Sequence, residues 1–342
     1  MTRALRALLS RFRHLIQIWK QVVFAGNRYG VSVRNRFRAL SMGGFTPDQY
    51  VLFDLKHNDP TDYISQLDAI RARAINSPFN QIINNSVVSK EALGHYLTVQ
   101  KILARVNRGG RLISNCAEVR RLVDLITLLK AGQTLVFKKT RTARELEVRL
   151  SGSTILLGAD RSFSNWLEFG QWVKRLSNWH ILEPVVPHNY TDSFDIGHIP
   201  TVKIIMIRDI SNGAWKPCIA LHRIPSKYGR LISRIDLDTG ELSSAVSLRT
   251  RMVFDCHPGT RSPIEGMHIP HWQDIKESLA QATEHFPFLN YLVYMLVVTQ
   301  EGFTVVGVHT STELATAQLW GGQRQQELGE FLKAHGFLKS RR

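Results

Sequence analysis

The chain has 342 residues, of which 44% are hydrophobic and 21% charged, and it contains no glycine, serine or proline tract. This composition excludes a disordered chain and predicts an ordered protein with a sizeable core. The formal net charge is +16, and the first forty residues supply more than half of it because they hold nine arginines and lysines and no acid.

The sequence disfavours several classes of protein. The sequence contains no run of about 18 apolar residues, so no membrane-spanning helix is predicted. Its N-terminus lacks a compact apolar segment followed by a cleavage site, so no signal peptide is predicted and we expect a cytoplasmic location. The three cysteines, Cys116, Cys218 and Cys256, are far apart and predict neither a disulfide framework nor a zinc site. No nucleic-acid-binding motif accompanies the basic charge, which argues against nucleic acid as a partner.

The first predicted element is a basic amphipathic helix. Apolar residues recur every three or four positions from Leu5 to Val23, and arginines fill the opposite face. Such a stripe can pack on the body of the protein, or it can lie on an anionic membrane surface at the inner face of the membrane. Residues 1–40 could therefore meet anionic lipid, a glycosyltransferase or the protein itself.

Helices and then short strands follow in the first half of the chain. The patterns predict helices over 62–75, over 89–106 with Ser89 as N-cap, and over 117–131 with Gly132 as the stop signal. Strands are predicted over 134–138, 145–150 and 154–157, as an antiparallel meander. A helix over 163–176 and a strand over 180–186 complete this part.

The second half is mostly strand. Strands are predicted over 201–208, 217–224 and 231–237, with a tight turn ending at Gly240. A helix over 274–286 and strands over 291–299 and 303–309 follow. The order predicts an α+β fold in which a basic helical region, 1–75, precedes two α+β lobes, 76–190 and 191–335.

No phosphate-binding loop, dinucleotide fingerprint, serine elbow or paired zinc motif is present. The informative signal is an ordered series of weaker landmarks. These are GFTPDQY at 44–50, a helix start at Lys90, LVFK at 135–138, ILEPVV at 181–186, PTVK at 200–203, IDLDTG at 235–240, HPGT at 257–260 and IP at 269–270. This order resembles the sugar-transfer associated ATP-grasp family, over roughly residues 44 to 315.

The resemblance implies two α+β lobes whose antiparallel sheets clasp ATP in a cleft. It also implies an ATP-dependent ligase that forms a carbon–nitrogen bond: a carboxylate is activated as an acyl phosphate, and an amine then attacks it. The expected substrates are a small-molecule carboxylate, such as a sugar acid or an amino acid, and an amine. The resemblance further implies a role in surface-polysaccharide biosynthesis.

The resemblance also assigns residues to the nucleotide. Lys138 and Lys90 would contact its phosphates as compact positive charges. Glu183, Val185 and Val186 would read the adenine edge through backbone groups and one carboxylate. Each has an ordinary alternative, because a lysine at a strand end often lies in solvent and an apolar run is often a core strand.

Two further residues are candidates for catalysis. Lys203 stands where the family has arginine, which keeps the charge but loses the bidentate fork. His257 lies in a predicted loop with Thr260 and would contact an acyl group or a phosphate, unless it is simply a loop histidine.

The largest departure concerns magnesium. The family places an aspartate, a glutamate and an asparagine where this chain has Met295, Gly307 and His309. Magnesium prefers hard oxygen ligands, so no metal-ligating residue is predicted, unless a shifted register brings in Glu301 or Glu313. Residues 139–150 also lack the glycines expected of a phosphate loop.

Three functions therefore stay open from the sequence. The chain is an active ligase, a catalytically degenerate ATP-grasp protein (a pseudoenzyme) that binds an anion or a partner without turnover, or a basic protein that binds a membrane or nucleic acid.

Overall fold

The computed structural model describes residues 16, 21–22, 24–140, 145–158, 161–194, 198–311 and 314–338. The helix predicted from Leu5 to Val23 therefore lies largely outside the described residues. The chain divides into two compact units: Thr98–Val186 forms one, and Met1–Leu97 together with Pro187–Arg342 forms the other. None of the described helices combines the length and the apolar character needed to cross a bilayer.

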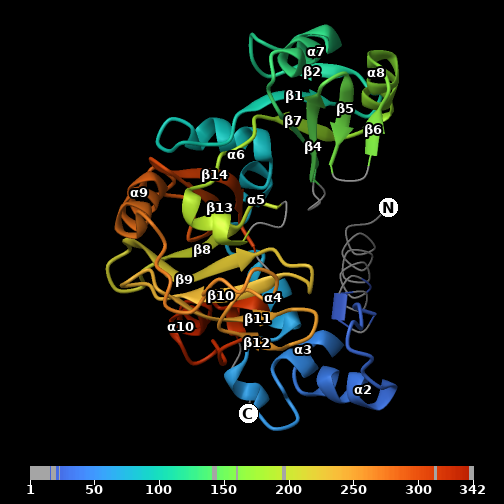
Figure 1. Cartoon of the computed structure of the whole chain (residues 1–342). Helices are drawn as coiled ribbons and strands as arrows, with labels where there is room; N and C mark the ends of the chain where they lie inside the picture. Colours follow the sequence, from blue (N-terminus) through green and yellow to red (C-terminus); the bar gives the residue numbers. More distant parts are fainter. Residues whose placement is uncertain are drawn as a thin grey trace, which may run out of the picture. The chain divides into compact units, whose positions relative to one another are not determined.

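The smaller unit, residues 98–186, is a seven-stranded antiparallel sheet with two helices (Figure 1). Its strands run in the order β2-β1-β7-β3-β4-β5-β6, with bounds β1 Ile102–Val106, β2 Leu112–Ser114, β3 Leu135–Lys139, β4 Glu145–Ser151, β5 Thr154–Leu157, β6 Arg161–Phe163 and β7 Trp179–Leu182. The helices α7 (Leu122–Lys130) and α8 (Trp166–Arg175) bury Leu125, Leu129 and Phe169 against Phe137 and Ile181 of the sheet.

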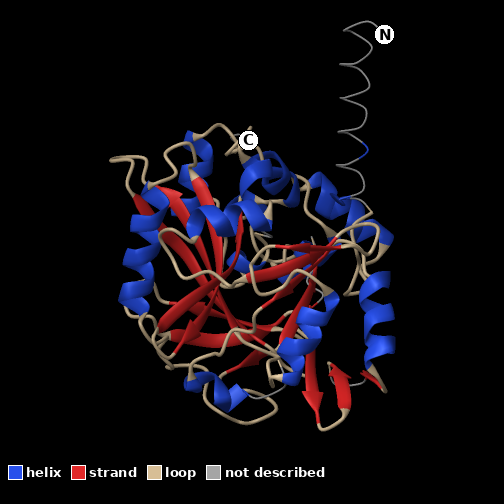
Figure 2. Ribbon diagram, turned by 90° about the horizontal axis from the view of Figure 1, so that it is seen from above, coloured by secondary structure: helices blue, strands red, loops and turns tan. Residues whose placement is uncertain are grey.

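The larger unit is built on a second antiparallel sheet of seven strands, in the order β12-β11-β10-β9-β8-β13-β14. Its strands are β8 Thr201–Arg208, β9 Trp215–Ile224, β10 Leu231–Ile235, β11 Leu242–Ser247, β12 Val253–Phe254, β13 Tyr291–Thr299 and β14 Gly302–His309. Strands of these two sheets are red in Figure 2. Each strand of this sheet pairs antiparallel with its neighbour, which is the arrangement predicted for an α+β fold.

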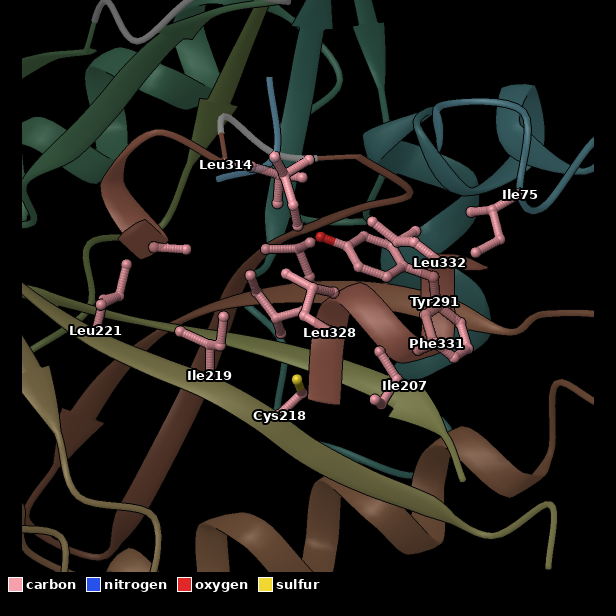
Figure 3. Packing of buried hydrophobic residues seen from close by; sticks show 14 of the residues in the cluster. Ile75, Ile207, Cys218, Ile219, Leu221, Tyr291, Leu314, Leu328, Phe331 and Leu332 are labelled. Carbon is pink, nitrogen blue, oxygen red and sulfur yellow. The ribbon is translucent and has the colours of Figure 1, made fainter. Parts of the chain in front are cut away.

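Helices cover both faces of this sheet. The larger unit contains α2 Val33–Ser41, α3 Pro47–Leu52, α4 Gln66–Ala72, α5 Asn80–Ile83, α6 Ser86–Leu93, α9 Trp272–Glu284 and α10 Glu327–Ala334, with short 3-10 turns at Pro60–Asp62, Asn189–Phe194 and Thr316–Gln318. On one face, Leu328 and Leu332 of α10 pack on Ile207, Ile219 and Leu221 (Figure 3). On the other face, the hydroxyl of Thr283 on α9 forms a hydrogen bond with the hydroxyl of Tyr294 on β13, 2.8 Å away.

Most predicted strands are confirmed. The strands 154–157, 201–208 and 291–299 have the predicted bounds, and the α+β class is correct. The turn at Gly240 is also confirmed: its φ is +78°, and its N–H donates to the carbonyl of Asp236 over 2.9 Å.

Several predicted bounds are wrong. The helix predicted over 89–106 is α6, which begins at Ser86 after the N-cap Asn85 and ends at Leu93; Ile102–Val106 is β1 instead. A short apolar run fits either period, which explains the error. The strand predicted over 180–186 ends at Leu182, because Pro184 has no N–H to give to a ladder.

Two other helices are shorter than predicted, and some elements were missed. The helix predicted over 62–75 is α4, Gln66–Ala72, capped by Ser65, and that predicted over 117–131 is α7, which begins at Leu122. The strands β11 and β12 and the helix α10 were not predicted. The serines in β11 and the brevity of β12 give little strand signal.

Candidate functional site

A row of cross-strand neighbours on the larger sheet contains four of the residues that the sequence singled out. Lys203 on β8 lies directly opposite Met295 on β13, and Met295 in turn lies opposite Gly307 on β14. Directly opposite residues of antiparallel strands place their side chains on the same face, with Cβ atoms about 5 Å apart. These three positions therefore lie together on one face of the sheet.

Lys203 is almost fully buried, with 6% of its surface exposed. Its ammonium donates to the hydroxyl of Thr316, 3.1 Å away, in the turn Thr316–Gln318 that precedes α10. A buried ammonium is costly unless hydrogen bonds and negative groups surround it. The hydrogen bond to Thr316 holds this basic side chain at the place where the resemblance expects an arginine.

A second cation, Arg223 on β9, reaches the same row. Arg223 lies opposite Thr201 of β8, two residues from Lys203, and its Nη1 donates to Met295 Sδ over 3.8 Å. The sulfur of Met295 thus contacts a guanidinium at the place where a metal-binding aspartate would stand. Sequence reasoning missed Arg223, although the register of the hairpin formed by β8 and β9 could have revealed it.

His309 completes the row on β14. It lies opposite Val293, and its Nε2 would be 3.5 Å from a Cβ added at Gly307. The same added Cβ would be 3.7 Å from the Cβ of Met295. Both distances are ordinary contacts, so a side chain larger than glycine has room to begin at position 307.

These residues do not fit magnesium. A thioether, a glycine and an imidazole stand where the resemblance places three oxygen donors, and magnesium binds in an octahedron of hard oxygens. Among the described residues, no group of three or more histidines, cysteines, aspartates and glutamates could hold a metal ion.

The two carboxylates that could have rescued a metal site do not change this result. Glu301 lies in the turn that joins β13 to β14, six residues beyond Met295, and the strand from Met295 to its end at Thr299 alone extends about 13 Å. Glu313 lies outside the described residues.

Lys90 and His257 belong to the same unit as Lys203. Lys90 is buried on α6, with 7% of its surface exposed. His257 has no exposed surface, and both ring nitrogens are used inside the protein: Nδ1 lies 3.0 Å from the Thr260 hydroxyl and Nε2 lies 3.1 Å from the carbonyl of Pro225. These contacts anchor the loop after β12 to the end of β9, and a catalytic role for His257 stays a prediction.

Lys138 belongs to the smaller unit. It lies on β3 opposite Glu145 of β4 and His180 of β7, and its ammonium forms an ion pair with Glu145. Its neighbour Phe137 points to the face that α7 and α8 cover, so Lys138 points to the other face. The side chain is 32% exposed, which leaves it accessible to a phosphate.

The predicted adenine-reading segment follows β7 in the same unit. Glu183 forms an ion pair with Lys101, 3.4 Å away, and its backbone is held by the backbone carbonyl of Lys101 and by the side chain of Gln100. The backbone of the residues that follow makes fewer contacts. No hydrogen bond joins the backbone of Val185 or Val186 to another described residue, and Val186 is 74% exposed. The adenine-reading role of Glu183, Val185 and Val186 stays a prediction.

Comparison with protein families identifies one match. Residues 174–327 match the family described as sugar-transfer associated ATP-grasp. This match confirms the resemblance found in the sequence, and it spans the strands β8 to β14 that carry Lys203, Met295, Gly307 and His309. No curated protein matches the chain.

Solved structures provide more distant similarities. N5-carboxyaminoimidazole synthase from Aspergillus clavatus, in complex with ADP and 5-aminoimidazole ribonucleotide, is 9% identical with a TM-score of 0.43, over 88% of this chain and 63% of that one. D-alanine–D-alanine ligase from Bacillus anthracis, complexed with ATP, is 11% identical with a TM-score of 0.33, over 75% of this chain and 60% of that one. An N5-carboxyaminoimidazole ribonucleotide synthetase in complex with ADP is 13% identical with a TM-score of 0.38, over 69% of this chain and 46% of that one. The chain thus spans less than two thirds of the length of each.

Proposed function

We propose that this chain binds the phosphate groups of a nucleotide and does not catalyse magnesium-dependent phosphoryl transfer. Residues 174–327 match the sugar-transfer associated ATP-grasp family, which supports nucleotide binding. The observation that carries the proposal is the row on the larger sheet. Lys203 and Arg223 bring two positive charges to Met295, while the positions that would hold magnesium have no carboxylate.

The physical argument rests on how phosphate charge is offset. In an ATP-grasp ligase, the charge that develops on the transferred phosphoryl group needs strong electrostatic stabilisation, and metal ions are its usual source. Without metal, a guanidinium and an ammonium can still bind phosphate by charge-assisted hydrogen bonds. Binding is then retained, whereas stabilisation of the transition state is largely lost.

The smaller unit supports a nucleotide rather than a simple anion. Within this unit, the backbone of Val185 and Val186 would contact an adenine edge, and Lys138 would contact a phosphate. Within the larger unit, Lys90 is a further candidate for phosphate binding, in addition to Lys203 and Arg223. The expected small-molecule partner is therefore an adenine nucleotide.

An active ligase that joins a carboxylate to an amine is the second candidate. It is favoured by the family match and by the retention of a cation at position 203. In that case the substrates would be a sugar acid or an amino acid and an amine, as in surface-polysaccharide assembly. This candidate requires a metal ligand other than Met295, Gly307 and His309.

A thermal-shift experiment separates the two candidates. The melting temperature is measured with ATP in EDTA and with ATP in excess magnesium. Our proposal predicts an increase of several degrees that is the same in both buffers. An increase that occurs only with magnesium would support the ligase, and no increase in either buffer would exclude nucleotide binding.

A further inference from the structure

The helix α2 has two unlike faces. At 100° per residue, Val33, Phe37, Ser41, Arg34 and Arg38 fall within one arc of about 140°. All five are exposed, whereas Ala39, on the opposite side, has no exposed surface and packs with Phe45 and Tyr50. The helix is thus fixed to the protein by one face and presents the other outward.

The outward face combines apolar and positive side chains. Val33 is 68% exposed and Phe37 is 59% exposed, one turn apart on the same side of the helix. Arg34 and Arg38, also one turn apart, lie beside them. We call Val33, Arg34, Phe37 and Arg38 the α2 face. A hollow of about 600 Å³ is lined by Arg34, Phe37 and Arg38 of this face together with Leu40 and Ser41.

Two other arginines near α2 are held by partners within the protein, unlike the arginines of the α2 face. Arg28 pairs with Asp48 over 3.2 Å, and the Nε of Arg36 donates to the carbonyl of Val31 over 3.3 Å. Neither the guanidinium of Arg34 nor that of Arg38 forms a hydrogen bond or an ion pair with another described residue. Asp48 is also the first acid of the chain, so no carboxylate precedes it in sequence.

We propose that the α2 face docks on an anionic lipid bilayer. An interfacial helix places aromatic and aliphatic side chains at the boundary of the acyl region while arginines meet the anionic headgroups, and the α2 face supplies both components on one side. Charge complementarity argues against other occupants. A second copy would oppose arginine to arginine, and residues 1–23 are themselves basic.

The exposed apolar pair distinguishes a bilayer from nucleic acid. A nucleic-acid backbone attracts arginines but gains nothing from Val33, and binding to it depends mainly on the number of cations. A bilayer responds to both kinds of side chain. This inference is independent of nucleotide binding, because it involves neither Lys203 nor Arg223.

The test is vesicle co-sedimentation of the full chain with two variants and one control. Vesicles contain either phosphatidylcholine alone or phosphatidylcholine with about 30% phosphatidylserine. The first variant, Val33→Ser with Phe37→Ser, removes the apolar pair; the second, Arg34→Glu with Arg38→Glu, reverses the charges. The control, Leu167→Ser with Arg175→Glu, changes an exposed leucine and arginine on α8.

The proposal predicts that the wild type and the control sediment with the anionic vesicles only. The apolar variant should bind about tenfold more weakly, and the charge variant more weakly still, with unchanged melting temperatures that show both are folded. Equal binding of wild type and both variants would overturn the proposal and assign membrane binding to residues 1–23. Absence of sedimentation by the wild type, or loss of binding to a 20-nucleotide RNA by the charge variant alone, would also overturn it.

Discussion

Met295 of β13 and Gly307 of β14 lie directly opposite each other across an antiparallel pair, with Lys203 on the other side of Met295. The related enzymes of the sugar-transfer associated family are expected to have an aspartate and a glutamate at these two places. The pairing shows that the two positions are neighbours in space. Under the proposed function, the two substitutions therefore fall at one site rather than at two unrelated positions.

Restoring the two carboxylates should restore a response to magnesium. A Cβ at Gly307 meets only ordinary contacts, at 3.5 and 3.7 Å, so Met295→Asp with Gly307→Glu is expected to fold. The carboxylates would pair with Arg223 and Lys203 and supply hard oxygens to the metal. The measurement is the shift in melting temperature that magnesium adds in the presence of ATP, which we expect to be near zero in the wild type and several degrees in the variant.

The matched control for this prediction is Met295→Asn with Gly307→Gln, which has similar volume and no charge. It should give no added shift. If the carboxylate variant also gives none while remaining folded, this row is not the position of a lost metal site.

Lys203 should matter for anion binding through its charge. Lys203→Arg retains the charge, and we expect its affinity for ATP to be within about threefold of the wild type. Lys203→Met should weaken binding by about tenfold or more, since it removes a charge-assisted hydrogen bond. Titration calorimetry measures both, with the exposed Lys56→Met as a control that should bind like the wild type; equal affinity of all four proteins would remove Lys203 from the binding site.

The sequence predicted the long strands of the larger unit more accurately than its helices. Strands 201–208 and 291–299 were predicted to the residue because each is a continuous apolar run whose ends are marked by polar or turn residues. Helix 89–106 was wrong because Gly94 ends α6 early and the apolar residues after it fit either period.

The candidate site was predicted in part. The three positions that depart from the family pattern follow from the order of landmarks, and the strand register shows that they are neighbours, which the sequence did not indicate. The contact between Arg223 and Met295 was missed because it depends on pairing between β9, β8 and β13, which are far apart in sequence. The buried environment of His257 was equally hidden, since a loop position says nothing of what packs over it.

Acid should destabilise the protein through His222. Complete burial lowers the pKa of His222 from its ordinary 6.5 to about 3; its Nε2 lies 3.0 Å from the Tyr190 hydroxyl, and its Nδ1 has no hydrogen-bond partner among the described residues. Between pH 6.5 and pH 3 the unfolded chain binds a proton here and the folded chain does not. The contribution is therefore complete above pH 6.5 and is lost as the pH falls, by about 1.4 kcal/mol per pH unit.

Urea denaturation between pH 7 and pH 5 measures this effect, because carboxylates titrate little in that window. His222→Gln keeps a hydrogen-bonding group for Tyr190 and does not titrate, so the slope should flatten by about one proton. An unchanged slope would show that His222 is not the group responsible.

The ion pair between Asp68 and Arg324 should be important for folding. Arg324 Nη1 lies 2.7 Å from Asp68 Oδ2, and the two side chains are only 3% and 4% exposed. Arg324→Met leaves a buried carboxylate without its main partner, so we expect a loss of about 3 to 5 kcal/mol in the free energy of unfolding. Asp68→Leu combined with Arg324→Met should recover much of it.

The control for this prediction is Arg71→Met. Arg71 meets the same Asp68 at 3.4 Å but is 42% exposed, so its loss should cost less than about 1 kcal/mol. If Arg71→Met and Arg324→Met lower the free energy of unfolding by similar amounts, the contribution of the Asp68–Arg324 pair to stability does not come from its burial.

The most direct test of the account is the dissociation constant of ATP for the full chain, measured by titration calorimetry in EDTA and in excess magnesium. If Lys203 and Arg223 bind the phosphates in place of a metal, the two constants should agree within about twofold, with no release of ADP or phosphate over the titration. A dissociation constant that falls by more than about tenfold on addition of magnesium, with ADP formed, would contradict it.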